Sequence, residues 1–107
     1  MNIGNITVGR GGVPALGLAP MAGVTDLTFR GICRRHGADF TVTEMVSAKA
    51  LRYGDRKTPE LCRLAPDEHP SAIQLFGREP PTMAWAAAHL LSADNPPGII
   101  DINMGCP

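Results

Sequence analysis

The chain has 107 residues, of which 44% are hydrophobic and 19% are charged, and its formal net charge is zero. This length and composition predict one small globular domain and exclude a disordered chain. They also argue against a dedicated electrostatic nucleic-acid binder, which is usually basic. Basic residues gather between Lys49 and Arg63, where a solvated loop and helix face is the simpler interpretation and a phosphate-contacting surface is the alternative.

Four short apolar runs have the length of β-strands. They occupy residues 15–19, 40–43, 72–76 and 99–103. Most of them are too continuous in apolar residues for strands with one solvated face, and are typical of parallel strands covered on both sides. We expect a small hairpin within the first dozen residues, which include Gly11-Gly12, before the first run.

Helical segments are predicted between these strands. Asp26 is placed to cap a helix that Gly37 ends, with an apolar stripe of Phe29, Ile32, Cys33 and His36. Pro80-Pro81 can open another helix that runs through Leu91. The polar insert at residues 47–70 is expected to hold short helices.

The alternation of strands and helices predicts an α/β fold with a parallel sheet, right-handed crossovers and no internal domain boundary. Unusual residues gather where the predicted strands end. They are Pro20-Met21-Ala22-Gly23, Glu44-Met45, Gln74 with Phe76-Gly77, and Asn103-Met104-Gly105-Cys106. Because parallel α/β folds bind ligands at the carboxyl ends of their strands, we predict a functional site at this rim.

The three cysteines, Cys33, Cys62 and Cys106, have neither CxxC nor metal-ligand spacing, and we predict no metal site. Their odd number, without an amino-terminal signal segment, fits a reducing compartment. No apolar run approaches the roughly 20 residues that span a bilayer. We therefore expect a soluble cytoplasmic protein that does not contact membranes; its oligomeric state cannot be read from these features.

Several rim residues have both a functional and a structural interpretation. Cys106 could serve as a nucleophile or general acid, or be a small buried hydrophobe. The Gln74 amide suits the imide-like edge of a flavin or pyrimidine ring, or an internal amide network. Met21 and its small neighbours Ala22 and Gly23 could form a flat shelf for a planar ring, or simply a tight turn that needs glycine.

The last predicted strand carries two polar residues on one face. Asp101 and Asn103 alternate with apolar residues, so both point the same way. For Asp101 we favour a structural hydrogen-bond network, whereas Asn103, nearer the rim, could hold the amide edge of a substrate. Glu44 could orient a neighbour or contact a ligand, and the sequence leaves both open.

Four motifs occur in a familiar order: LAPMAGVTDLTFR (residues 18–30), TEMVSA (43–48), IQLFG (73–77) and DINMGCP (101–107). Together they resemble the amino-terminal part of bacterial tRNA-dihydrouridine synthases, most closely the B subgroup. The resemblance covers the chain from about residue 3. The first and last motifs are specific as a pair, and each alone would be a weaker signal.

The resemblance implies a TIM-barrel flavoenzyme that uses FMN, with NADPH as electron donor, to reduce the C5–C6 double bond of uridine in tRNA. Hydride would pass from reduced flavin to C6, and a proton would reach C5. By resemblance, Pro20, Met21 and Ala22 line the FMN ring and Gln74 contacts the flavin. Cys106 matches the proton donor, and Asn103 looks like the asparagine near the target uracil.

A TIM barrel typically takes about 250 residues. We therefore expect residues 1–107 to be the first half of such a barrel, about four strands, without the later strands and the helical tRNA-binding domain, and inactive alone. Two alternatives stay open. One is another FMN-dependent barrel that acts on free pyrimidines, such as a dihydroorotate or dihydropyrimidine dehydrogenase. The other is an inactive fragment that serves only as an interaction module.

Overall fold

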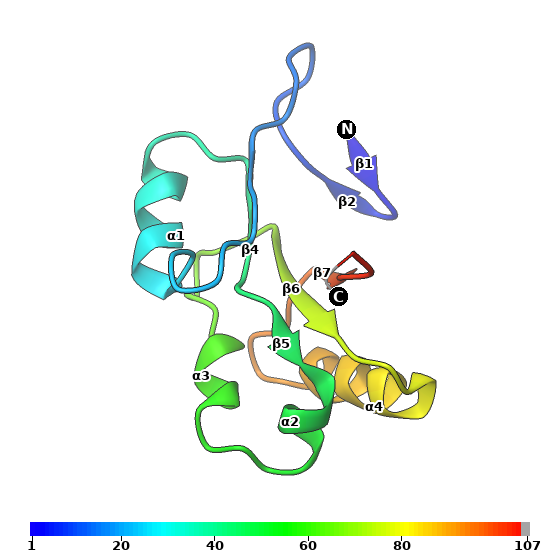
Figure 1. Cartoon of the computed structure of the whole chain (residues 1–107). Helices are drawn as coiled ribbons and strands as arrows, with labels where there is room; N and C mark the ends of the chain where they lie inside the picture. Colours follow the sequence, from blue (N-terminus) through cyan, green and yellow to red (C-terminus); the bar gives the residue numbers. More distant parts are fainter. Residues whose placement is uncertain (106–107) are drawn as a thin grey trace.

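The computed structural model describes residues 1–105. An antiparallel hairpin of β1 (Asn2–Ile3) and β2 (Ile6–Thr7) comes first in the chain (Figure 1). Its turn contains Gly4, whose φ of 58° is a left-handed conformation that glycine adopts without strain. The expected hairpin is therefore present, but it turns before Gly11-Gly12.

The main sheet of residues 1–105 has five strands, and all of their pairings are parallel. They are β3 (Gly17–Leu18), β4 (Phe40–Val42), β5 (Val46–Ser47), β6 (Ser71–Phe76) and β7 (Ile99–Ile102). β4 pairs with β3 and β6, and β7 pairs with β6. The predicted parallel α/β architecture is confirmed, and each of the four apolar runs contains a strand.

β5 was not predicted. Both β4 and β5 pair with β6, and an irregularity in the pairing separates them. Val42 lies opposite Ala72 and Val46 lies opposite Leu75. The chain therefore advances four residues from β4 to β5 while β6 advances three. The extra residue is the signature of a β-bulge. Thr43 bridges the step: its N–H donates to the Ala72 carbonyl at 3.0 Å and its hydroxyl accepts from the Gln74 N–H at 3.2 Å.

Four helices accompany the strands within residues 1–105. They are α1 (Leu27–Arg35), α2 (Ala48–Arg52), α3 (Thr58–Leu61) and α4 (Pro80–Leu91). The Asp26 carboxylate accepts from the Phe29 N–H at 2.8 Å, as expected of the cap, and Gly37, with φ 103°, follows the end of α1. None of these helices has the length and apolar character needed to cross a membrane.

The apolar core lies between the sheet and the α2–α4 side of the molecule (Figure 1). Its buried residues are Val46, Ala48, Leu51, Leu64, Ile73, Leu75, Ala86 and Leu90. The predicted stripe on α1 is not part of it: Phe29 is 36% exposed and Ile32 is 40% exposed. The buried residue of α1 is instead Arg30, because a carboxylate far along the sequence draws its guanidinium inward.

Candidate functional site

Three polar residues in the carboxyl-terminal halves of β6 and β7, or directly after them, form a chain of polar contacts. Gln74 and Asp101 are register partners, and the Gln74 Nε2 donates to Asp101 Oδ2 at 2.6 Å. The Asn103 Nδ2 donates to Gln74 Oε1 at 3.3 Å, and Asn103 Oδ1 accepts from the Gly105 N–H at 3.1 Å. Gln74 is 8% exposed. The network thus fixes which end of the Gln74 amide faces which neighbour.

This arrangement bears on two predictions. The structural network favoured for Asp101 is confirmed by its bond to Gln74. For Gln74 the internal network is present, and it does not use the whole amide group: within residues 1–105, Nε2 donates one hydrogen bond, although it carries two protons. Asn103 lies in the same chain, and its Nδ2 also approaches the Met45 sulfur at 3.8 Å.

The residues predicted to form an apolar shelf lie in a tight turn between β3 and α1. The Thr25 side chain closes this turn, because its hydroxyl accepts from the Met21 N–H at 3.0 Å and donates to the Met21 carbonyl at 3.2 Å. Gly23 has φ 76°, a conformation that disfavours any side chain there. Met21 is 42% exposed and Ala22 is exposed, while Pro20 is half-buried. The turn therefore presents an apolar surface beside the rim.

Glu44 and Met45, in the bulge between β4 and β5, connect the turn with the polar chain. Glu44 Oε1 accepts from the Gly23 N–H at 2.5 Å, and Met45 reaches Asn103. Adjacent residues in extended backbone point to opposite sides, and a bulge changes the direction of such side chains. Glu44 and Met45 can therefore reach different partners although they are neighbours in the sequence. Sequence reasoning left the role of Glu44 open, and the structure shows its carboxylate bonded to the backbone of the turn.

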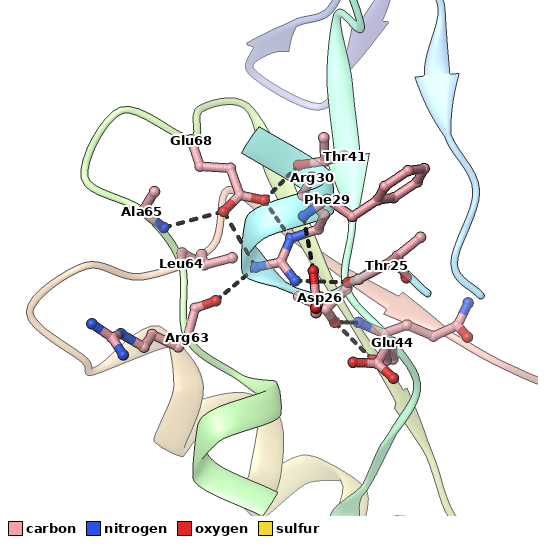
Figure 2. A network of polar contacts seen from close by, with 12 residues as sticks. Thr25, Asp26, Phe29, Arg30, Thr41, Glu44, Arg63, Leu64, Ala65 and Glu68 are labelled. Carbon is pink, nitrogen blue, oxygen red and sulfur yellow. Dashed lines mark hydrogen bonds and ion pairs between the residues drawn. The ribbon is translucent and has the colours of Figure 1, made fainter. Parts of the chain in front are cut away.

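Behind the turn lies a buried ion pair that sequence reasoning missed (Figure 2). Arg30 Nε donates to Glu68 Oε1 at 2.6 Å, and both side chains are nearly inaccessible, at 2% and 3% exposure. Glu68 also accepts from the Thr41 hydroxyl at 2.8 Å and from the Ala65 N–H at 3.1 Å. The two charged residues are 38 positions apart, so no local spacing signals their pairing.

The carboxyl of Glu68 has a lowered pKa. Its burial would raise the pKa, but the hydrogen bonds from Arg30, Thr41 and Ala65, together with the charge of Arg30, outweigh burial. Glu68 is therefore an anion at neutral pH, matched to the guanidinium. A fully bonded pair of this kind avoids the cost of an uncompensated buried charge.

Two of the three cysteines lie within the described residues. Cys106, the predicted proton donor, lies outside the described residues. Burial raises the pKa of the Cys62 thiol to about 11, so this thiol is a poor nucleophile at neutral pH. Cys33 is half-buried on α1. Residues 1–105 contain no cluster of three or more His, Cys, Asp or Glu side chains that could hold a metal ion.

The fold and the rim define a parallel α/β domain with a polar site at the carboxyl ends of its strands. Residues 17–107 match the dihydrouridine synthase (Dus) family, and the chain belongs to that family. It is 41% identical over its whole length to tRNA-dihydrouridine synthase B of Xanthomonas campestris pv. campestris. It is also 45% identical over 89 residues to a probable tRNA-dihydrouridine synthase of Treponema pallidum, covering 83% of this chain and 26% of that protein.

A third relative is tRNA-dihydrouridine synthase B of Pseudomonas aeruginosa, which is 42% identical over 90 residues, or 84% of this chain and 26% of the relative. The chain spans about 30% of the length of the Xanthomonas protein. The likeness therefore covers nearly all of this chain and less than a third of each of these relatives.

Proposed function

We propose that this chain forms part of a TIM-barrel tRNA-dihydrouridine synthase that binds FMN and takes electrons from NADPH. The observation that carries the proposal is the convergence of motif residues at one rim in a member of the Dus family. Gln74, Asn103 and Met45 meet there, and Glu44 links them to the Met21 turn. The relatives named as tRNA-dihydrouridine synthases support the same reaction.

The residues at the rim fit a planar cofactor in two respects. Met21 and Ala22 are exposed on a turn whose backbone is fixed by hydrogen bonds, so they offer a rigid apolar surface to a ring. Gln74 is held in one orientation by Asp101 and Asn103, and its second amide proton can donate to a ring heteroatom. We assign Pro20, Met21, Ala22 and Gln74 to FMN on this basis.

The reaction adds one hydride and one proton across the C5–C6 bond of uracil. FMN held by Pro20, Met21, Ala22 and Gln74 would supply the hydride to C6, with NADPH as the source of the electrons. We assign the proton at C5 to the Cys106 thiol, because an ordinary thiol pKa of about 8.5 leaves it mostly protonated at neutral pH. Asn103 is assigned to the uracil edge, where an amide can both donate and accept. The base must leave its stack to reach such a site.

Basic side chains near the same rim support tRNA as the partner. A hollow of about 530 Å³ lies past the ends of β5 and β6, and it is lined by Ser47, Lys49, Phe76, Gly77, Arg78, Glu79 and Thr82. Lys49 and Arg78 bring positive charge to it, and Arg52 beside it donates to the Thr82 hydroxyl at 3.1 Å. Cations in this position suit backbone phosphates, which dominate nucleic-acid affinity.

The test uses the complete protein encoded at the locus of this chain, supplied with FMN, NADPH and an unmodified tRNA transcript. Nucleoside mass spectrometry should detect dihydrouridine. Cys106→Ala should slow its formation by about 10²- to 10⁴-fold, the contribution typical of a general acid, and the flavin absorbance should persist. Cys62→Ala is the matched control and should retain activity, because that thiol is only partly accessible and has a high pKa.

Two results would overturn the proposal. One is a protein that reduces free uracil or orotate and leaves tRNA unchanged, which would favour another pyrimidine oxidoreductase. The other is a protein that binds no flavin. Full activity of Cys106→Ala would remove the assignment of the proton donor alone.

A further inference from the structure

The turn from Met21 to Thr25 is held from two sides by charged residues that do not belong to it. On one side, the Gly23 N–H donates to the Glu44 carboxylate at 2.5 Å. On the other, Arg30 Nη1 donates to the Thr25 carbonyl at 2.9 Å. Figure 2 shows the contact between Arg30 and Thr25 beside the Asp26 cap of α1, with Glu44 close to the same turn. The turn thus has one anchored N–H and one anchored C=O within three residues.

Arg30 is itself fixed more firmly than an ordinary helix side chain. Its Nε and Nη2 bind the two oxygens of Glu68 at 2.6 and 3.3 Å, and Nη2 also donates to the Arg63 carbonyl at 2.7 Å. The planar fork of a guanidinium matches such an array, and a lysine ammonium does not. Arg30 therefore connects the turn with the segment that follows α3 through several hydrogen bonds of fixed geometry.

A buried ion pair is weak evidence for stability, since apolar residues of similar volume often serve as well. The contacts of the Arg30–Glu68 pair point to a role in fixing the geometry of the turn. Arg30 donates to the Thr25 carbonyl, and the Thr25 hydroxyl bonds to both the N–H and the carbonyl of Met21. Arg30 and Glu44 are thus each one hydrogen bond away from the backbone of the turn that carries Met21 and Ala22.

We propose that Glu44 and Arg30, the latter oriented by Glu68, are positioning residues for the Met21–Thr25 turn. They set the place of Met21 and Ala22 against the flavin ring, an inference that rests on the proposed function. Neither residue is assigned a contact with the reacting atoms. Glu44 acts through the Gly23 N–H, and Arg30 acts through the Thr25 carbonyl.

The main test is Glu44→Ala in the complete protein, because Glu44 is only half-buried and its removal leaves no buried charge. Loss of the anchor should weaken FMN binding or lower kcat by about ten- to a hundredfold, the range expected when a hydrogen bond to a charged group or about an ångström of placement is lost. The absorption band of the bound flavin should shift, and KM for tRNA should stay near the wild-type value.

Two further variants separate positioning from general damage. Glu44→Gln keeps an oxygen for the Gly23 N–H and should restore most of the flavin affinity and the band position. Glu60→Ala removes an exposed carboxylate that pairs only with Arg63 among the described residues, and should match the wild type. Arg30→Lys keeps the charge beside Glu68 but loses the planar fork, and should also shift the flavin band. It tests the same turn independently if Glu44→Ala fails to fold.

The outcomes distinguish a failure of the proposed function from a failure of the positioning role. A wild-type protein that binds no FMN overturns the proposed function, and this inference with it. A wild-type protein that binds FMN and reduces tRNA, with Glu44→Ala and Arg30→Lys unchanged in flavin affinity, spectrum and kcat, overturns the inference alone. Equal damage in Glu44→Ala and Glu44→Gln would also overturn it, because the glutamine retains the accepting oxygen.

Discussion

The α1 side and the α2–α4 side of the molecule are held together by different forces. Around α2 and α4, β5 and β6 bury a continuous set of apolar side chains. Around α1, the buried residue of the helix is charged, and the contacts are an ion pair and hydrogen bonds to backbone carbonyls. Apolar packing is non-directional, whereas hydrogen bonds fix angles as well as distances. The side that carries the predicted flavin-facing turn is the one held by directional contacts.

The largest expected effect comes from breaking the ion pair on one side only. Arg30→Met should destabilise the complete protein by about 3–5 kcal/mol, because it leaves Glu68 buried without its partner. Arg30→Met combined with Glu68→Leu should recover much of that loss, since neither charge then remains buried. Denaturant unfolding of the wild type, both single variants and the double variant measures the coupling. Additive losses would mean that the pair does not act as a unit.

An apolar truncation on the other side should cost slightly less and should leave the turn in place. Ile73 is 1% exposed in the core, and Ile73→Ala should lower the free energy of unfolding by about 2–5 kcal/mol. Ile73→Val is the graded control, with an expected loss of about 0.5–1.5 kcal/mol. The same unfolding experiment measures both. A similar loss from Leu91→Ala, at an exposed position of α4, would contradict this placement of the core.

The smallest effect should be a loss of stability at acid pH that is caused by Glu68 on the α1 side. Because Glu68 has a lower pKa folded than unfolded, its contribution is fully present above the unfolded value of about 4.3. It is lost as the pH falls below that value through the folded pKa. Urea unfolding from pH 7 to pH 3 should show a steeper acid loss for the wild type than for Glu68→Gln. Equal slopes below pH 4.3 would contradict the assignment.

Much of the fold could be predicted because its signals are local. The Asp26 cap, the Pro80-Pro81 start of α4 and the apolar runs each depend on a few adjacent residues. The bulge at Thr43 could not be predicted, because it depends on the register of β6 against β4 and β5. Nor could the burial of Arg30, whose partner is brought close only by the completed fold.

In the site, too, local patterns could be predicted, whereas contacts that depend on strand register could not. Sequence alternation placed Asp101 and Asn103 on one face, and the structure joins both to Gln74. The choice between an internal network and a ligand contact for Gln74 needed the register that sets it opposite Asp101. Met45 was noted only for its place at a strand end, and its approach to Asn103 follows from the bulge.

The most direct measurement is a crystal structure of the complete protein with FMN bound. We predict that the ring lies within about 4 Å of Met21 and Ala22, the distance of apolar contact. We also predict that Gln74 Nε2 lies about 3 Å from a ring heteroatom while keeping its bond to Asp101. A flavin bound away from this rim, with Met21 and Gln74 facing solvent, would contradict the assignment of these residues to FMN.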